Sequence, residues 1–187
     1  MDVHLRKVHR KPSSDYADGY YFVTVCTHNF VHSLGEIVDS KLVPTVVGGI
    51  LDRCINEITQ HYHYIEVVEY VVMPNHWHAL FWINAPDIAL DTTEDKGCLH
   101  APAHEIKHTP FAKRTHFNSL LARAVGGVKS AVTRKAKSLG LKFKWQRGFY
   151  DNIVTHQEMF DKICYYIENN PESWELDRFY KNAAIGI

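Results

Sequence analysis

Two histidines one residue apart, His76 and His78, are the strongest chemical signal in this 187-residue chain. They lie in the apolar, β-prone run 71–83, directly after the turn-forming sequence Met73-Pro74-Asn75. Because residues i and i+2 of a strand point to the same face of a sheet, we expect the two imidazoles side by side on one face. Two neutral imidazoles at this spacing can bind one divalent metal ion, and the alternative is a pair that packs or ends a strand.

A tyrosine and an amide near the end of the chain form a second chemical candidate. Tyr166 and Asn170 are four residues apart in a helix predicted over 157–170, so their side chains share one helical face. Tyr165 lies about a quarter-turn away and is better explained by packing. A phenol facing a metal site suggests attack of the tyrosine oxygen on a phosphodiester that the metal polarises, with a covalent phosphotyrosine as the product. The alternative is an ordinary, half-buried helix tyrosine.

The charge of the chain is balanced overall but unevenly distributed. The formal net charge is zero, from 21 basic and 21 acidic residues. Between Glu105 and Tyr150 nearly every charged residue is basic, whereas acids predominate after Asp151. A polyanion is the natural partner of such a basic block, and the alternative is a solvated helix face. The candidate phosphate-binding residues are Lys129, Arg134, Lys135, Lys137, Lys142, Lys144 and Arg147. Trp145 lies among them, where it either stacks on bases or packs in the core.

Composition indicates a globular protein with one main domain. Apolar residues make up 45% of the chain and aromatic residues 12%, which excludes global disorder. No apolar run reaches membrane-spanning length, and the first residues lack the apolar core of a secretion signal. The four cysteines are far apart in sequence and read as reduced thiols. We therefore expect a cytoplasmic protein with no membrane association.

The hydrophobic patterns predict an α+β fold. We expect an antiparallel sheet with flanking helices, arranged as a ferredoxin-like split βαβ unit. The predicted strands span 20–27, 64–72 and 77–83, with a short strand ending at 154, and the predicted helices span 44–62, 118–139 and 157–170. Pro44 suits the first turn of its helix, and the segment before it reads as a loop.

The chain divides into a central domain and two smaller end segments. Residues 1–19 read as a flexible basic arm and residues 20–171 as the main domain. Within that domain, residues 85–116 are rich in Pro, Thr, Asp and His and read as a surface insertion or linker. Residues 172–187 form a C-terminal tail whose aromatic residues, Trp174 among them, are expected to fold back on the core.

Four segments, in the order in which they follow one another along the chain, resemble the single-tyrosine HUH transposases, that is, the IS200/IS605 family and especially the REP-associated tyrosine transposases. The first is the run 73–78, Met-Pro-Asn-His-Trp-His, and the last is 166–171, Tyr-Ile-Glu-Asn-Asn-Pro. Between them, residues 117–133 resemble the family's basic helix, and 145–151 resemble its aromatic segment before the catalytic helix. The resemblance spans 20–171.

The resemblance implies a role for each matching residue. It implies His76 and His78 as metal ligands, Tyr166 as the nucleophile and Asn170 in the place of the third, polar ligand. The functional ion would be Mg²⁺ or Mn²⁺, and two imidazoles with an amide could also hold Zn²⁺, Ni²⁺ or Co²⁺. The substrate would be single-stranded DNA folded into hairpins, which is cleaved and rejoined through a 5′-phosphotyrosine and a free 3′-hydroxyl. In this DNA transposition and recombination chemistry, the basic residues and Trp145 would be DNA-binding.

Some features are left open by the resemblance. Relatives often have a histidine where this chain has Asn152, a departure that bears on proton transfer or DNA contact. Relatives include both homodimers that share active sites and monomers, so the oligomeric state stays open. Mobile and domesticated enzymes are not distinguished, and neither is the recognition sequence.

Three alternatives remain. The first is a catalytically silent, domesticated DNA-binding protein that acts as a repressor or structural factor. The second is a zinc site in the insertion, whose candidate ligands are Cys98, His100, His104 and His108. The third is a hydrolase in which His76 and His78 activate water with Glu66 or Glu69 as the carboxylate, a reading that gives Tyr166 no role.

Overall fold

The computed structural model of the chain describes residues 19–84 and 120–180. The predicted arm, except for Gly19, and the predicted insertion 85–116 with its four candidate zinc ligands lie outside these residues. Among the helices described, none is both long and apolar enough to cross a membrane.

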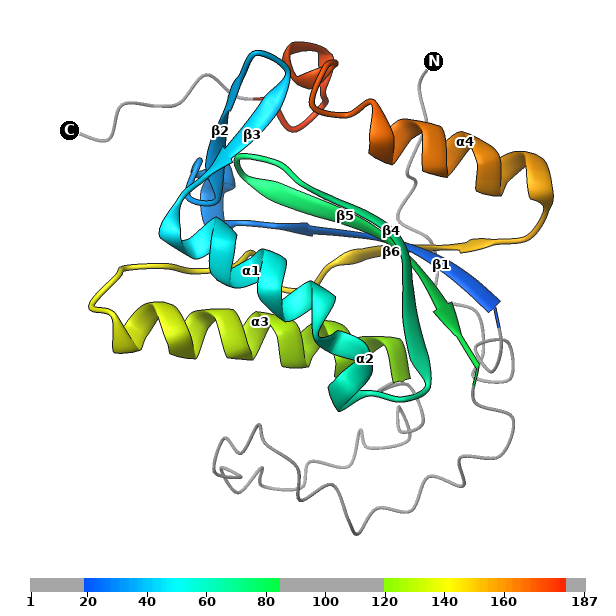
Figure 1. Ribbon diagram of the computed structural model, residues 1–187, viewed down its shortest axis with the longest axis horizontal. Coiled ribbons are helices and arrows are strands. Elements are labelled where there is room, and N and C mark those ends of the chain that lie inside the picture. The colour runs from blue at the N-terminus through cyan, green and yellow to red at the C-terminus, as the bar shows by residue number, and fades with distance from the viewer. Residues whose placement is uncertain (1–18, 85–119, 181–187) are drawn as a thin grey trace, which may run out of the picture.

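A four-stranded antiparallel sheet forms the centre of the molecule (Figure 1). Its strands are β1 (Gly19–Cys26), β4 (Ile65–Val72), β5 (His76–Ile83) and β6 (Tyr150–Val154), in the order β4-β5-β1-β6. β1 lies between β5 and β6 in the sheet and pairs antiparallel with both. This is the strand order of a ferredoxin-like split βαβ unit, so the predicted α+β fold is confirmed.

Helices cover both faces of the sheet (Figure 1). On one face lie α1 (Val46–Asn56), α2 (Ile58–His61) and α3 (Leu120–Ser138), over a large apolar core that includes Trp77 and Phe81. On the other face lies α4 (Gln157–Glu168), over a smaller cluster built on Phe22, Leu80 and Ile167. The two layers follow from the alternation along β5, because odd-numbered residues point to the large core and even-numbered residues to α4.

A hairpin occupies the segment that was predicted as a loop. Strands β2 (Gly35–Val38) and β3 (Lys41–Pro44) pair antiparallel, through a turn in which Asp39 and Ser40 have positive φ. The prediction that Pro44 begins the helix was therefore wrong, since Pro44 ends β3. Thr45 is the N-cap of α1, and its hydroxyl accepts a hydrogen bond of 3.1 Å from Gly48 N.

Residues 169–180 fold back over the α4 side of the sheet, so the predicted return of the tail to the core is confirmed for this part, and residues 181–187 lie outside those described. After α4 the chain turns at 169–173 and forms the short 3₁₀ helix η3 (Trp174–Leu176). Trp174 and Phe179 are buried there, and their rings lie 6.0 Å and 4.8 Å from the ring of His76. A second 3₁₀ turn, η2 (His28–Phe30), follows β1, and the Phe30 ring stacks on Phe179 at 5.7 Å. These two segments close the end of the sheet where β5 begins.

Candidate functional site

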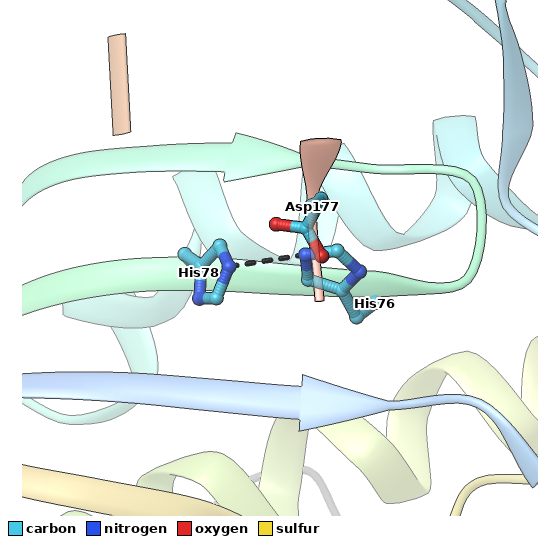
Figure 2. Close-up of side chains that lie close together, drawn as sticks. All are labelled: His76, His78 and Asp177. Atoms are coloured by element: carbon cyan, nitrogen blue, oxygen red, sulfur yellow. Dashed lines mark hydrogen bonds between the residues drawn. The ribbon is translucent and has the colours of Figure 1, made fainter. Parts of the chain in front are cut away.

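The two histidines of β5 lie side by side on the α4 face, as the spacing predicted (Figure 2). Their Nε2 atoms are 3.0 Å apart, and both side chains are almost completely buried. Burial, with smaller contributions from the partner imidazole and Arg178, holds the pKa of His76 well below its ordinary value. Burial, with the charge of Arg178, lowers the pKa of His78 to about 3. Both rings are therefore neutral at physiological pH, which is the form that binds metals.

Each imidazole uses its second nitrogen for a hydrogen bond to the protein. His76 Nδ1 lies 2.8 Å from Asn75 Oδ1, and His78 Nδ1 lies 2.8 Å from the Thr24 hydroxyl on β1. Phe22, two residues before Thr24, stacks on the His78 ring at 5.2 Å. These contacts fix both rings through their Nδ1 atoms, so that the two Nε2 atoms face one another.

Tyr166 projects from α4 toward the histidine pair. Its hydroxyl lies 3.2 Å from His78 Nε2 and donates a hydrogen bond of 3.1 Å to Asp177 Oδ2. Burial and the Asp177 carboxylate raise the pKa of the phenol well above its ordinary value, while a hydrogen bond from Asn170 lowers it. The phenol is therefore protonated, and its proton already points at a carboxylate. By contrast, Tyr165 is 69% exposed, so it does not pack as the sequence suggested.

Asp177 is a site residue that the sequence did not identify. Its carboxylate and the ring nitrogens of His76 and His78 all lie within 4.8 Å of one another, and Figure 2 shows Asp177 over the His76 ring with His78 to one side. Its other oxygen accepts a hydrogen bond of 2.6 Å from Phe179 N, which fixes its orientation. The available signal was weak: an acid placed between Trp174 and Phe179, in a tail expected to return to the core.

Asn170, the predicted third ligand, is buried beside the phenol. It is 2% exposed, and its Oδ1 atom finds no hydrogen-bond partner among the residues described. An unpaired buried acceptor is costly in an apolar interior, so this oxygen is suited to a cation or another donor. The structure thus brings His76, His78 and Asp177 together, with Asn170 beside the Tyr166 phenol that faces them.

The donor set fits a small divalent cation. Octahedral Mg²⁺ has ligands at about 2.1 Å, so neighbouring ligands are about 3 Å apart. The observed separation of the two Nε2 atoms, 3.0 Å, matches that spacing. The carboxylate and amide oxygens suit Mn²⁺ or Mg²⁺, whereas the two neutral imidazoles favour Zn²⁺ and similar transition-metal ions, so the donor set alone does not select one ion.

Most of the predicted DNA-binding residues line one open groove of about 710 Å³ between α3 and the segment 143–148. The predicted residues that line it are Lys129, Arg134, Lys137, Lys144, Trp145 and Arg147. It lies on the α3 side, so the sheet separates it from Tyr166. Tyr150, which follows the segment 143–148, lies on the histidine side, with its ring 6.4 Å from that of Phe179. We call this the basic groove.

Lys129 has a structural role within the basic groove. Its ammonium donates hydrogen bonds of 2.8 Å and 2.7 Å to the carbonyl oxygens of Gln146 and Gly148, and burial lowers its pKa. Trp145 donates from its indole nitrogen to Lys129 O at 3.1 Å and packs edge-on against Phe143. Both residues therefore shape the groove as well as line it, and phosphate contact by Lys129 stays a prediction.

The remaining predicted residues lie elsewhere. Lys135 lines a separate groove between α3 and the α1–α2 layer, and Lys142 is exposed outside both grooves. Asn152 lies on β6 opposite Phe22, on the α4 face. Glu66 and Glu69, the carboxylates considered for a hydrolase, are exposed on β4 opposite Trp82 and Leu80. Among the residues described, the carboxylate that lies beside the two histidines is that of Asp177.

Comparisons with known proteins agree with this fold. No protein-family model matches the chain. An uncharacterized protein of Haemophilus influenzae is 26% identical over 180 residues, which cover 95% of this chain and 93% of its own length. Among solved structures, a REP-associated tyrosine transposase bound to a REP hairpin matches 92% of this chain and 76% of its own, with a TM-score of 0.54 and 16% identity. The chain therefore has a fold like that of the tyrosine transposases.

Proposed function

We propose that this protein is a metal-dependent single-tyrosine DNA transposase or endonuclease, which cleaves and rejoins single-stranded hairpin DNA. One observation carries the proposal: the Tyr166 hydroxyl lies 3.2 Å from His78 Nε2 and 3.1 Å from Asp177, beside a buried histidine pair. Groups that could serve as nucleophile, proton acceptor and cation ligands thus lie side by side, on a fold like that of a tyrosine transposase, which supports the proposal.

The chemistry follows from these contacts. The phenol oxygen of Tyr166 attacks a backbone phosphorus, and its proton passes to the Asp177 carboxylate, to which it is already hydrogen-bonded. The new Oη–P bond replaces the P–O3′ bond, so a 5′-phosphotyrosine forms and the 3′ oxygen leaves and takes up a proton. Mg²⁺ or Mn²⁺, when bound, neutralises charge on the phosphate oxygens. Attack of a 3′-hydroxyl on the phosphotyrosine reverses the step and rejoins a strand, so no nucleotide cofactor is required.

Each donor has a distinct task in this proposal. His76 and His78 would hold the cation through ring nitrogens, and Asn170 would add its unpaired oxygen. Asp177 would use one carboxylate oxygen for the cation and the other, Oδ2, for the Tyr166 proton. Phe22 packs edge-on against the Tyr166 ring at 6.1 Å, and with the hydrogen bond to Asp177 this contact holds the nucleophile in one geometry. The basic groove holds the strand by its phosphates, and its charges set the salt dependence of binding.

The alternative is a catalytically silent DNA-binding protein. The basic groove supports it, because this groove lies across the sheet from Tyr166 and its charges do not depend on the metal site. The two functions make the same prediction for DNA binding and opposite predictions for covalent chemistry.

The test is incubation with labelled single-stranded hairpin DNA from the flanks of the gene, with Mn²⁺, followed by a denaturing gel. The proposed function predicts a covalent adduct that requires Mn²⁺ and is lost in Tyr166→Phe. Tyr165→Phe is the matched control, because this neighbouring phenol is exposed and away from the histidines. Binding without an adduct at any Mn²⁺ concentration would favour the silent alternative.

A further inference from the structure

Asn75, the residue before the histidine motif, is completely buried and every polar atom of its side chain is used. Its Nδ2 donates hydrogen bonds to Phe30 O at 3.2 Å and to Phe179 O at 2.9 Å. Its Oδ1 lies 2.8 Å from His76 Nδ1. The amide thus joins the loop after β1, the C-terminal tail and a metal-ligand candidate.

This arrangement fixes which way the amide is oriented. Phe30 O and Phe179 O are carbonyl oxygens that only accept hydrogen bonds, so the amide nitrogen must face them. The amide oxygen, an acceptor, then faces His76. The nitrogen of His76 that it meets must therefore carry a proton, because two acceptors cannot share a hydrogen bond. His76 Nδ1 is then protonated, and its unprotonated Nε2 accepts a hydrogen bond from His78 Nε2, 3.0 Å away, until a cation takes that place.

The backbone around Asn75 prevents the amide from turning. Asn75 O accepts hydrogen bonds from Thr27 N at 2.8 Å and from the Thr27 hydroxyl at 2.9 Å. The Phe30 carbonyl is presented by two successive residues with positive φ, Asn29 and Phe30. On the tail side, Phe179 packs on both Phe30 and the His76 ring. Each partner of the amide is held independently of it.

We propose that Asn75 is a positioning residue, which holds His76 in the Nδ1–H tautomer so that its Nε2 can bind the cation and which docks the tail that carries Asp177. The inference rests on the proposed metal site and deepens it. His78 differs in this respect. Its Nδ1 meets the Thr24 hydroxyl, which can donate or accept, so no tautomer is imposed from that side. The tautomer of His76 is therefore fixed before the cation binds, whereas the tautomer of His78 can change when the cation binds.

The first measurement is the tautomer of His76 in the metal-free protein, from long-range ¹H–¹⁵N correlation spectra of ¹⁵N-histidine-labelled chain, with the signal assigned by its loss in His76→Gln. Wild type is expected to show a protonated Nδ1 and a bare Nε2. A protonated Nε2 in wild type would overturn the inference outright. This readout needs no cation, so it stands even where the proposed function fails.

The second measurement is Mn²⁺ affinity by calorimetry in wild type, Asn75→Ala and Asn75→Asp. Removing the acceptor in Asn75→Ala should move the proton to Nε2 and weaken Mn²⁺ binding about 10–100-fold. Asn75→Asp keeps an acceptor for Nδ1–H and should restore the tautomer and most of the affinity. It lacks the two donors, so its tail should be cleaved faster by protease than the wild-type tail. Asn56→Asp is the matched control, the same change at an exposed position on α1.

The outcomes are separable. Wild type that fails to bind Mn²⁺ argues against the proposed function, while its His76 tautomer still decides the inference. Unchanged tautomer and affinity in a folded Asn75→Ala would refute a positioning role, and so would an Asn75→Asp variant that loses the tautomer. Should Asn75→Ala fail to fold, wild type and Asn75→Asp carry the same test.

Discussion

Gly48 provides a quantitative test of how α1 supports the end of the sheet that carries the histidine pair. A Cβ built on Gly48 would lie 1.9 Å from the carbonyl oxygen of Leu34 and 3.0 Å from its carbonyl carbon. Leu34 is completely buried; its carbonyl accepts a hydrogen bond from Thr45 N at 2.9 Å and its N–H donates to Pro74 O at 3.0 Å. Gly48→Ala must therefore displace backbone that contacts the residue next to Asn75.

The expected cost follows from what has to move. Disrupting two backbone hydrogen bonds costs about 1 kcal/mol each. Overpacking adds about 1–3 kcal/mol. The sum is about 3–5 kcal/mol, a large part of the stability of a typical domain at about 5–15 kcal/mol. At about 2–4 °C per kcal/mol for a chain of this length, Tm should fall by about 6–20 °C.

Gly49 is the matched control, because it lies next in the same helix and a Cβ built there meets nothing within 4 Å. Gly49→Ala should stabilise the helix by about 0.5–1 kcal/mol, through the lower entropy of the unfolded chain. The assay is urea unfolding of both variants, followed by far-UV circular dichroism, with Mn²⁺ affinity measured alongside. Equal stabilities for the two variants would refute the reasoning, since it depends on one close contact at Leu34.

Three further predictions concern the basic groove, a buried thiol and the tail carboxylate. Arg147→Ala should weaken binding to single-stranded DNA and reduce the slope of log K against log[salt] by about 0.7. Lys41→Ala, on the distant β2–β3 hairpin, should change neither quantity. Fluorescence anisotropy at four salt concentrations measures both. Burial raises the pKa of the Cys26 thiol from 9.0 to about 12, so the unfolded chain loses this proton first and stability should fall as pH rises above about 9. The free energy of unfolding should therefore fall less between pH 8 and pH 10 in Cys26→Ala than in wild type, as measured by chemical denaturation. Asp177→Asn removes the negative charge of a proposed ligand and should weaken Mn²⁺ binding about tenfold or more. Glu175→Gln, at an exposed position on the same segment, should leave calorimetric affinity unchanged.

The elements with strong periodicity could be predicted from the sequence. The strand β5 and the helices α3 and α4 were found within a few residues of their observed ends, because their apolar residues repeat at the period of a strand or a helix over many positions. The β2–β3 hairpin was missed because its strands are four residues long and largely exposed, so burial imposes no pattern on them.

The candidate site was predictable only in its local parts. His76 and His78 are neighbours in the sequence, and Tyr166 and Asn170 share a helical face, so spacing alone relates the members of each pair. Asp177 reaches the histidines through the turn after α4, whose path depends on the packing of aromatic side chains. No periodic pattern encodes such a return. The hydrogen bonds of Asn75 likewise join segments far apart in sequence, and no spacing rule predicts them.

Mapping the covalently modified residue tests the central claim most directly. Wild-type protein is reacted with a single-stranded hairpin oligonucleotide and Mn²⁺, digested with nuclease and protease, and the nucleotide-bearing peptide is sequenced by mass spectrometry. The account predicts a 5′-phosphonucleotide on Tyr166 and none on Tyr165, although both lie in the same peptide. Modification of Tyr165, or of any residue other than Tyr166, would contradict it.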